Sequence, residues 1–259
     1  MPTGFSGLDR VLVGLGKSDV VLVGARPGMG KTSFAVNLAT YAATTTKKSV
    51  CIFSLEMSAE QLITRVMSSE ALIDSYRLRS GELTDEDWGK LAHAASRLSD
   101  CEILIDDTTG ITVTGMKAKL RRVKNLGMVV IDYLQLMQSD RRIDNRVQEV
   151  AEISRGQKLL AKELQVPVIC GAQLSRGPES RTDKRPMLSD LRDSGAIEQD
   201  ADIVLCLYRD EYYKTEKEEP QNIAEVIVAK NRHGSTGNVK MGWFGQYTKF
   251  TTLEEDRQE

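Results

Sequence analysis

A stretch near the N-terminus combines residue types that suit the binding of a phosphate group. Residues 20–32 read Val-Val-Leu-Val-Gly-Ala-Arg-Pro-Gly-Met-Gly-Lys-Thr. Glycines let the backbone approach an anion closely, and the N–H groups at the start of a helix attract its charge. Lys31 would reach the β- and γ-phosphates of a nucleotide, and the hydroxyl of Thr32 would bind Mg²⁺. The pattern predicts a P-loop between a strand and a helix.

The predicted nucleotide-binding residues follow one another through this turn into the helix: Ala25, Arg26, Pro27, Gly28, Met29, Gly30, Lys31, Thr32 and Ser33. The usual motif, G-x-x-x-x-G-K-T, has a glycine where this chain has Ala25, and Gly24 comes just before it. The alternative is a glycine-rich turn that precedes Lys-Thr by chance. We favour the P-loop, because an apolar run precedes the turn and an amphipathic run to about Ala43 follows it.

Three polar residues each follow an apolar, strand-like run. Asp132 could hold Mg²⁺ through water, opposite Thr32. Glu56 could act as the general base that activates water, and Gln173 could sense the γ-phosphate or orient that water. The alternatives are a charge at a helix start for Glu56, beside a capping Ser58, and an ordinary polar residue at a loop start for Gln173. The residue types and positions alone leave both pairs of alternatives open.

Two cations lie in a predicted turn after a late strand. Lys230 and Arg232, in Lys-Asn-Arg-His-Gly, could stabilise charge on a transferred phosphoryl group. The alternative is a turn whose charges are only solvated. His233 falls in the same turn and His93 on a predicted helix surface, and neither has a second metal ligand at a useful spacing.

Composition narrows the class of protein. The chain has 259 residues, 41% of them apolar and 28% charged, which suits one α/β domain over residues 1–259. A net charge of −2 means that any contact with nucleic acid must come from local clusters of cations. No apolar run is long enough to span a membrane. Four widely spaced cysteines indicate core thiols in a reducing cytosol: Cys51, Cys101, Cys170 and Cys206.

Periodicity predicts alternating strands and helices followed by a β-rich end. Helices are predicted at about 31–43, 58–73, 84–98, 113–124 and 146–164. Strands are predicted at 20–23, 49–55, 103–105, 128–131, 166–172, 203–208, 224–229, 238–244 and 249–253. Residues 3–16 are predicted to lead into the first strand, and the apolar residues 133–137 to continue the strand before them. Residues 214–222 and 254–259 are predicted to be exposed and mobile. A mainly parallel sheet flanked by helices should result.

Several of these stretches together resemble the C-terminal motor domain of DnaB-type replicative helicases, a RecA-like class. The matching segments are Thr-Gly-Phe-Ser-Gly-Leu-Asp (3–9), residues 24–32, Phe-Ser-Leu-Glu-Met-Ser (53–58), Val-Ile-Asp-Tyr-Leu-Gln-Leu-Met (130–137), Gln-Leu-Ser-Arg (173–176), Arg-Pro-Met-Leu-Ser-Asp-Leu-Arg-Asp-Ser-Gly-Ala-Ile-Glu-Gln-Asp-Ala-Asp (185–202) and Ala-Lys-Asn-Arg-His-Gly-Ser-Thr-Gly (229–237). A P-loop alone fits many families, whereas segments 53–58 and 185–202 together are highly specific. In this family an alanine at the place of Ala25 is ordinary.

The resemblance implies roles for particular residues. Glu56 would be the catalytic glutamate and Gln173 the γ-phosphate sensor, while Lys230 and Arg232 would act on the ATP of the neighbouring subunit. Single-stranded DNA would contact a loop at a central channel, and a second channel-facing loop would span residues 138–146. The DNA-binding residues implied are Arg192, Asp193 and Gly195 in the first loop and Arg141 and Arg142 in the second. The family often has glutamate where this chain has Asp193.

The resemblance also implies an activity and partners. A homo-hexameric ring would hydrolyse ATP with Mg²⁺, move 5′→3′ along single-stranded DNA and unwind duplex in a bacterial cytoplasm, or in that of a phage's host. A helicase loader is a candidate partner. The resemblance implies that the N-terminal helical domain and linker helix of full-length members would lie outside this sequence, so primase binding is not expected of it. The competing hypotheses are a recombinase-type ATPase that forms filaments on DNA, and a non-motor ring that uses nucleotide as structural glue.

Overall fold

A mixed β-sheet runs through the computed structural model, which describes residues 1–191, 195–213 and 221–253. Within these ranges the strand order is β3-β2-β4-β5-β1-β6-β7-β8-β9. The strands from β3 to β6 are parallel, and β7, β8 and β9 add to the sheet in antiparallel fashion. Their bounds are β1 Val20–Ala25, β2 Ser49–Ser54, β3 Ile103–Asp106, β4 Leu126–Asp132, β5 Val168–Gln173, β6 Ile203–Tyr208, β7 Ile223–Asn231, β8 Gly237–Phe244 and β9 Lys249–Thr252.

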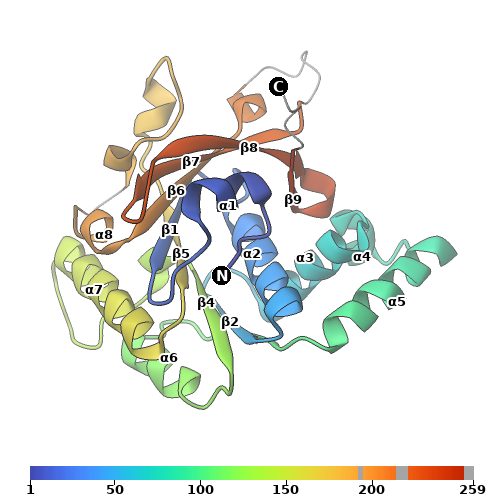
Figure 1. Ribbon diagram of the computed structural model, residues 1–259, viewed down its shortest axis with the longest axis horizontal. Helices are drawn as coiled ribbons and strands as arrows, with labels where there is room; N and C mark the ends of the chain where they lie inside the picture. Colours follow the sequence, from blue (N-terminus) through green and yellow to red (C-terminus); the bar gives the residue numbers. More distant parts are fainter. Residues whose placement is uncertain (192–194, 214–220, 254–259) are drawn as a thin grey trace.

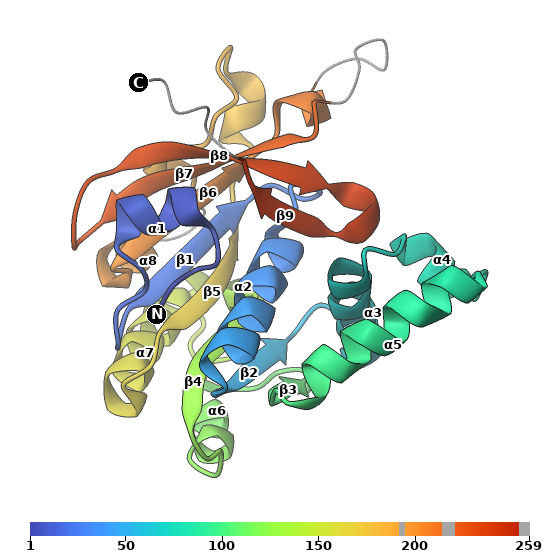
Figure 2. The same ribbon diagram turned by 45° about the vertical axis from the view of Figure 1, so that its right-hand side comes forward.

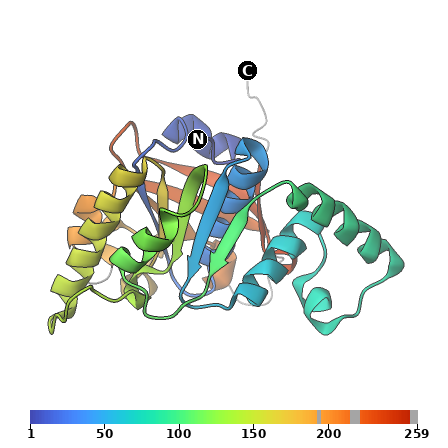
Figure 3. The same cartoon turned by 90° about the horizontal axis from the view of Figure 1, so that it is seen from below.

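Helices cover both faces of this sheet. Helices α1, α2 and α3 pack on one face, and α6, α7 and α8 pack on the other (Figure 1). Beyond the β2–β3 end of the sheet, α4 and α5 extend outward with α3 as an arm (Figures 2 and 3). The bounds are α1 Ser6–Leu12, α2 Lys31–Thr46, α3 Ala59–Ala71, α4 Ser75–Ser80, α5 Asp85–Ser99, α6 Val113–Leu120, α7 Arg146–Leu164 and α8 Gly195–Asp200. This is the predicted RecA-like α/β architecture, with its β-rich C-terminal part.

The register of the parallel strands aligns the ends that carry polar residues. Ala25 at the end of β1 lies beside Gln173 at the end of β5, and Ser54 at the end of β2 lies beside Asp132 at the end of β4. Glu56 follows β2 by two residues. Carboxyl ends of parallel strands form the edge at which open α/β sheets bind ligands. Residues far apart in the sequence therefore meet at one edge.

Short elements account for most differences from the sequence-based expectations. The lead-in at 3–16 contains α1, which buries Leu8 and Leu12 but is too short to show a clear helical period. The helix expected at 113–124 ends at Leu120, where turns lead into β4. Residues 133–137 do not continue β4, because a 3₁₀ turn at Leu134–Leu136 follows it directly. The expectations for 214–222 and 254–259 fall largely outside the described residues.

The four cysteines are free thiols. Cys51, Cys170 and Cys206 are buried, and burial raises the pKa of each to about 12, so each behaves as an inert core residue. Cys101 is only partly buried. No helix in the described ranges combines the length and the apolar character needed to cross a membrane.

An aromatic cluster fixes the helix that follows the P-loop. Phe34, in the first turn of α2, is fully buried and stacks on Phe5 with ring centroids 5.5 Å apart. The Phe34 ring also makes an edge-to-face contact with the ring of Phe250, with centroids 5.4 Å apart. The Phe250 ring in turn lies against that of Trp243, with centroids 4.5 Å apart. The helix that would bind phosphate is thereby attached to the antiparallel strands β8 and β9.

Replacing Phe34 by alanine should therefore destabilise the fold. We expect Phe34→Ala to lower the free energy of unfolding by about 3–5 kcal/mol, through lost burial and the cavity left behind. Urea denaturation followed by circular dichroism measures the change. Leu159→Ala is the control: this helical side chain is 61% exposed, so its removal should change stability by less than about 0.5 kcal/mol. Equal effects of the two substitutions would contradict the role of the cluster.

Candidate nucleotide-binding site

The turn between β1 and α2 has the backbone of an anion-binding loop. Gly30 caps the start of α2 with a φ of 95°, a conformation that side chains disfavour. A Cβ at Gly30 would also lie only 3.0 Å from the ring of Phe250. Glycine is thus required here, and α2 begins directly with Lys31, so its free N–H groups face the turn.

A cavity of about 420 Å³ lies over this turn. The residues that line it come from several elements: Ala25, Arg26, Pro27, Gly28, Gly30, Lys31, Thr32, Ser33, Glu56, Met57, Arg65, Tyr133, Gln173, Trp243 and Thr248. Eight of the nine predicted nucleotide-binding residues are among them. The ninth, Met29, is buried beneath the turn, where it supports the loop as a core residue.

Lys31 and Thr32 both face the buried carboxylate of Asp132. The Thr32 hydroxyl donates a hydrogen bond of 2.5 Å to Asp132 Oδ2, and Lys31 Nζ lies 3.1 Å from Oδ1. Oδ1 is buried and makes no hydrogen bond within the described residues, so the ammonium ion compensates its charge at close range. The Lys31 ammonium also lies 3.8 Å from the ring centroid of Tyr133. The arrangement leaves a carboxylate oxygen directed at a cation.

This donor set fits Mg²⁺ held jointly with phosphate. Mg²⁺ prefers oxygen ligands and is commonly bound by few protein groups plus substrate phosphates and water. The hydroxyl of Thr32, which lines the cavity, and the under-satisfied carboxylate of Asp132, buried directly behind it, offer such oxygens. No group of three or more His, Cys, Asp or Glu side chains in the described ranges could hold a metal without such help.

Glu56 and Gln173 border the same cavity from the two sides of Asp132. The Glu56 carboxylate is 54% exposed and 4.0 Å from Lys31 Nζ, so it can meet water in the cavity. Gln173 is held through its backbone, since its N–H donates to Gln135 Oε1 at 3.3 Å and its carbonyl accepts from Gln135 Nε2 at 3.4 Å. This anchoring leaves the Gln173 side chain able to respond to a ligand in the cavity that it lines.

Several lining residues have no signal in the sequence. Arg65 comes from α3 and donates to the Ser33 hydroxyl at 3.2 Å. Burial lowers the pKa of its guanidinium, although the charges of Asp132 and Glu56 act in the opposite direction. Burial raises the pKa of the Tyr133 hydroxyl, as do the carboxylates of Glu56 and Asp132. Tyr133 could have been suspected from its position after Asp132, whereas Arg65 is one polar residue among many on its helix.

Gly171 is a second residue that the sequence did not single out. A Cβ built on it would lie 2.9 Å from Asp132 Oδ1 and 3.2 Å from Lys31 Cδ. A side chain in this position of β5 would therefore displace the groups that face the phosphates. The requirement comes from two neighbouring strands, so no local pattern reveals it.

Lys230 and Arg232 lie at the opposite edge of the sheet from the cavity. β6 is parallel to β1, and Ile203 at its start pairs with Asn231 of β7. The six residues of β1, at roughly 3.3 Å each, separate the two edges by about 20 Å. Neither cation can reach the P-loop of its own chain. Burial, followed by the nearby charge of Arg232, lowers the pKa of the Lys230 ammonium.

Comparison with known proteins identifies the family. Residues 1–252 match the DnaB-like helicase C terminal domain. The chain belongs to this family. It is 56% identical to the replicative DNA helicase DnaC of Bacillus subtilis (strain 168) and 55% identical to the replicative DNA helicase DnaB of Geobacillus stearothermophilus, in each case over 98% of this chain and 57% of the relative. The chain thus spans just over half the length of these relatives.

Solved structures agree with this assignment. One of them, described as an ATPase domain, is similar with a TM-score of 0.92 and 41% identity, covering 98% of this chain and 91% of that one. A DnaB-like replicative helicase, described with its interactions with primase, has the same TM-score and identity but is covered over 63% of its length. The resemblance to DnaB-type motor domains is therefore confirmed for fold and family. Its helicase and ATPase-domain members imply nucleotide use by the domain.

The segments implied to contact DNA lie directly before or at the start of α7 and α8, two helices that pack together. Residues 138–145 lead into α7, and α8 begins at the exposed Gly195. Arg142 is almost fully exposed, and Arg141 is exposed but pairs with Glu152 at 2.6 Å. The structure thus leaves these side chains at the surface, where their DNA-binding role stays a prediction. The predictions for Arg192 and Asp193 concern residues outside the described ranges.

The close approach at Gly171 gives a prediction for nucleotide binding. We expect Gly171→Ala to weaken binding of Mg²⁺-nucleotide by roughly tenfold, about 1.4 kcal/mol, because the added methyl displaces Asp132 and Lys31. Titration with a fluorescent nucleotide measures the dissociation constant. Gly89→Ala is the matched control, since a Cβ at Gly89 in α5 meets nothing within 4 Å. An unchanged dissociation constant for Gly171→Ala would show that the strands can move to accommodate the methyl group without displacing Asp132 and Lys31.

Proposed function

We propose that this chain is the motor domain of an ATP-dependent DNA helicase that acts as a hexameric ring. The observation that supports this most strongly is the division of the predicted site between two edges of the sheet. The P-loop and Glu56 line one cavity, with Asp132 buried against Lys31 and Thr32 at the same edge, while Lys230 and Arg232 lie at the opposite edge. A site that needs both sets can be completed only by a neighbouring chain.

The proposed chemistry uses each residue at the cavity in a distinct way. Lys31 and the N–H groups at the start of α2 would bind the phosphates of ATP, and Mg²⁺, when held by Thr32 and Asp132, would neutralise phosphate charge. Glu56 would accept a proton from the attacking water, because its exposed carboxylate can approach water beside the cavity. Gln173 would orient that water or detect the γ-phosphate.

A ring follows from the geometry of such a shared site. An interface in which one face supplies the P-loop and the other supplies cations is heterologous, and repeated around an axis it closes into a ring or continues as a filament. The helicase family of the relatives favours the ring. Single-stranded DNA would pass through the channel, and movement 5′→3′ would follow the family. A loader protein is a further candidate partner.

Glu56→Gln tests the proposed chemistry most directly. The amide keeps the shape of the side chain but cannot accept a proton, so turnover should fall by roughly 10²–10⁴-fold while nucleotide binding is retained. Phosphate release in the presence and absence of single-stranded DNA measures turnover. Lys31→Ala serves as the comparison that loses nucleotide binding itself. Normal hydrolysis by Glu56→Gln would assign the base elsewhere, and wild-type protein without turnover would indicate a nucleotide used only as structural glue.

Mixed rings test whether Arg232 acts on a neighbour. An arginine supplied in trans can contribute roughly 10³–10⁵ in rate, so Arg232→Ala should bind ATP but hydrolyse it more slowly by about that factor, with a small residual kcat. Mixing it with Lys31→Ala under ring-forming conditions should restore part of the activity, since about a quarter of randomly formed interfaces hold both intact residues. If the subunits must hydrolyse ATP strictly in sequence, such mixed rings would stay inactive. A covalently linked dimer that contains one complete interface then tests whether Arg232 acts in trans. No turnover by that dimer with ATP bound would contradict action in trans.

DNA binding should depend on few cations. Each neutralised phosphate of a single strand contributes roughly −0.7 to the slope of log affinity against log salt. Arg192→Ala and Arg142→Ala should each make the slope less negative and weaken all sequences alike. The control is Arg97→Ala, which should leave the slope unchanged. Arg97 is an exposed arginine of the distant α5, and it pairs with Glu70 of α3. Loss confined to particular sequences would contradict backbone binding, and electron microscopy of rings or filaments would separate the helicase from a recombinase.

A further inference from the structure

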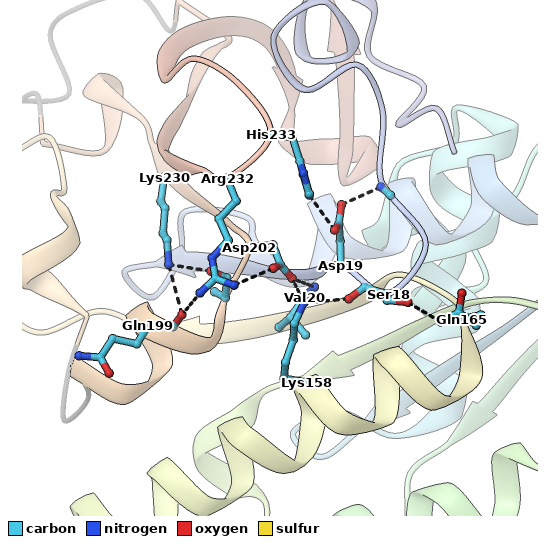
Figure 4. A network of polar contacts seen from close by, with 12 residues as sticks. Ser18, Asp19, Val20, Lys158, Gln165, Gln199, Asp202, Lys230, Arg232 and His233 are labelled. Carbon is cyan, nitrogen blue, oxygen red and sulfur yellow. Dashed lines mark hydrogen bonds and ion pairs between the residues drawn. The ribbon is translucent and has the colours of Figure 1, made fainter.

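A buried carboxylate lies directly beneath Arg232. Asp202 precedes β6 and is only 4% exposed. Its Oδ2 accepts a hydrogen bond of 2.8 Å from the N–H of Val20 and forms an ion pair with Lys158 of α7. Its Oδ1 lies 3.2 Å from Nη1 of Arg232 (Figure 4). The carboxylate thus joins the start of β1, the middle of α7 and the cation that we assign to a neighbour's ATP site.

The other contacts of the two cations fix the same region. The second guanidinium nitrogen of Arg232 donates to the carbonyl of Gln199 at the end of α8, and the Arg232 N–H donates to the Asp202 carbonyl at 2.9 Å. Lys230 Nζ donates to the carbonyls of Glu198 at 2.5 Å and Ala201 at 2.8 Å. The Arg232 fork is therefore held at two points, by a carboxylate and by a helix end.

Such anchoring matters for a cation that must act across an interface. The Arg232 side chain is 46% exposed, so without partners it would sample many rotamers. A planar guanidinium held at two points keeps one orientation, whereas small misplacements of a catalytic group cost rate. Preorganised charge near a developing negative charge is also among the most effective means of stabilising a transition state.

Lys158 gives Asp202 a second cation. When Arg232 also shares its charge with a phosphate, a buried carboxylate that had no other partner would be poorly compensated, which is strongly unfavourable. The ion pair with Lys158, whose ammonium also donates to the Ser18 carbonyl at 3.0 Å, keeps Asp202 neutralised. The guanidinium can therefore stay on the carboxylate and offer its remaining N–H groups to an anion of the neighbour at limited cost.

We propose that Asp202 is a positioning residue for Arg232, holding its guanidinium in place for the ATP of the neighbouring subunit. The inference rests on the proposed function, because it assumes that Arg232 acts in trans. Asp202 itself touches neither nucleotide nor DNA in this arrangement.

The test is a double-mutant cycle in assembled rings. Asp202→Asn keeps the size of the side chain but removes its charge, and kcat for ATP should fall by roughly 10- to 100-fold with the nucleotide dissociation constant unchanged. In the Arg232→Ala background the same change should have no further effect on kcat, because Asp202 acts only through Arg232. A merely structural role would lower kcat in both backgrounds.

Two further variants separate position from stability. Asp202→Glu keeps the charge beside Lys158 but moves the carboxylate by one methylene, so it should fold and still lower kcat. Asp87→Asn removes another buried carboxylate, ion-paired with Arg77 on the distant arm, and should lower thermal stability without this loss of kcat.

Each remaining outcome has one meaning. Normal kcat for Asp202→Asn or for Asp202→Glu, with Arg232→Ala inactive, would overturn the positioning role alone. A further loss of kcat when Asp202→Asn is added to Arg232→Ala would overturn it as well. Normal turnover by Arg232→Ala would instead overturn the trans assignment in the proposed function, and the positioning role with it.

Discussion

Strand β1 pairs in parallel with β5 on one side and with β6 on the other. This pairing places the carboxyl ends of the parallel strands at one edge, so the P-loop, Asp132 and Gln173 meet although about a hundred residues or more separate the P-loop from the other two along the chain. The same pairing carries the start of β6 to the other edge. Because β7 returns antiparallel to β6, Arg232 must lie there as well. One sheet thus presents two complementary halves of a site on opposite edges.

Two buried carboxylates mark these halves, and each is matched with a lysine. Asp132 faces Lys31 at the phosphate-binding edge, and Asp202 pairs with Lys158 at the other. Asp132 has an oxygen without a hydrogen-bond donor that could face a cation, and Asp202 holds the guanidinium that we propose to face an anion of the neighbour. Burial makes both arrangements sensitive, since unpaired charge in the interior is costly.

The antiparallel strands do more than extend the sheet. Phe250 packs against Phe34, Phe250 and Trp243 both lie over Gly30, and Trp243 and Thr248 line the cavity. The C-terminal part therefore closes one side of the nucleotide site and fixes the start of α2. Arg209 contributes to the same wall, donating to the Gly28 carbonyl at 3.0 Å and lying over the ring of Trp243.

Local spacing and periodicity were enough to predict the P-loop, the alternation of the strands with the longer helices, and the polar residues at strand ends, but not the short helices α1, α4 and α8. The sequence also carried enough specific motifs to indicate the DnaB-like family. Packing between distant elements is what brings Arg65 and Trp243 to the cavity and places Gly171 against Asp132 and Lys31, so the sequence could not reveal these contacts. Likewise, only strand register showed that Arg232 cannot serve its own P-loop and that Asp202 lies beneath it. Local patterns encode elements, whereas contacts between distant residues depend on how the strands pair and the helices pack.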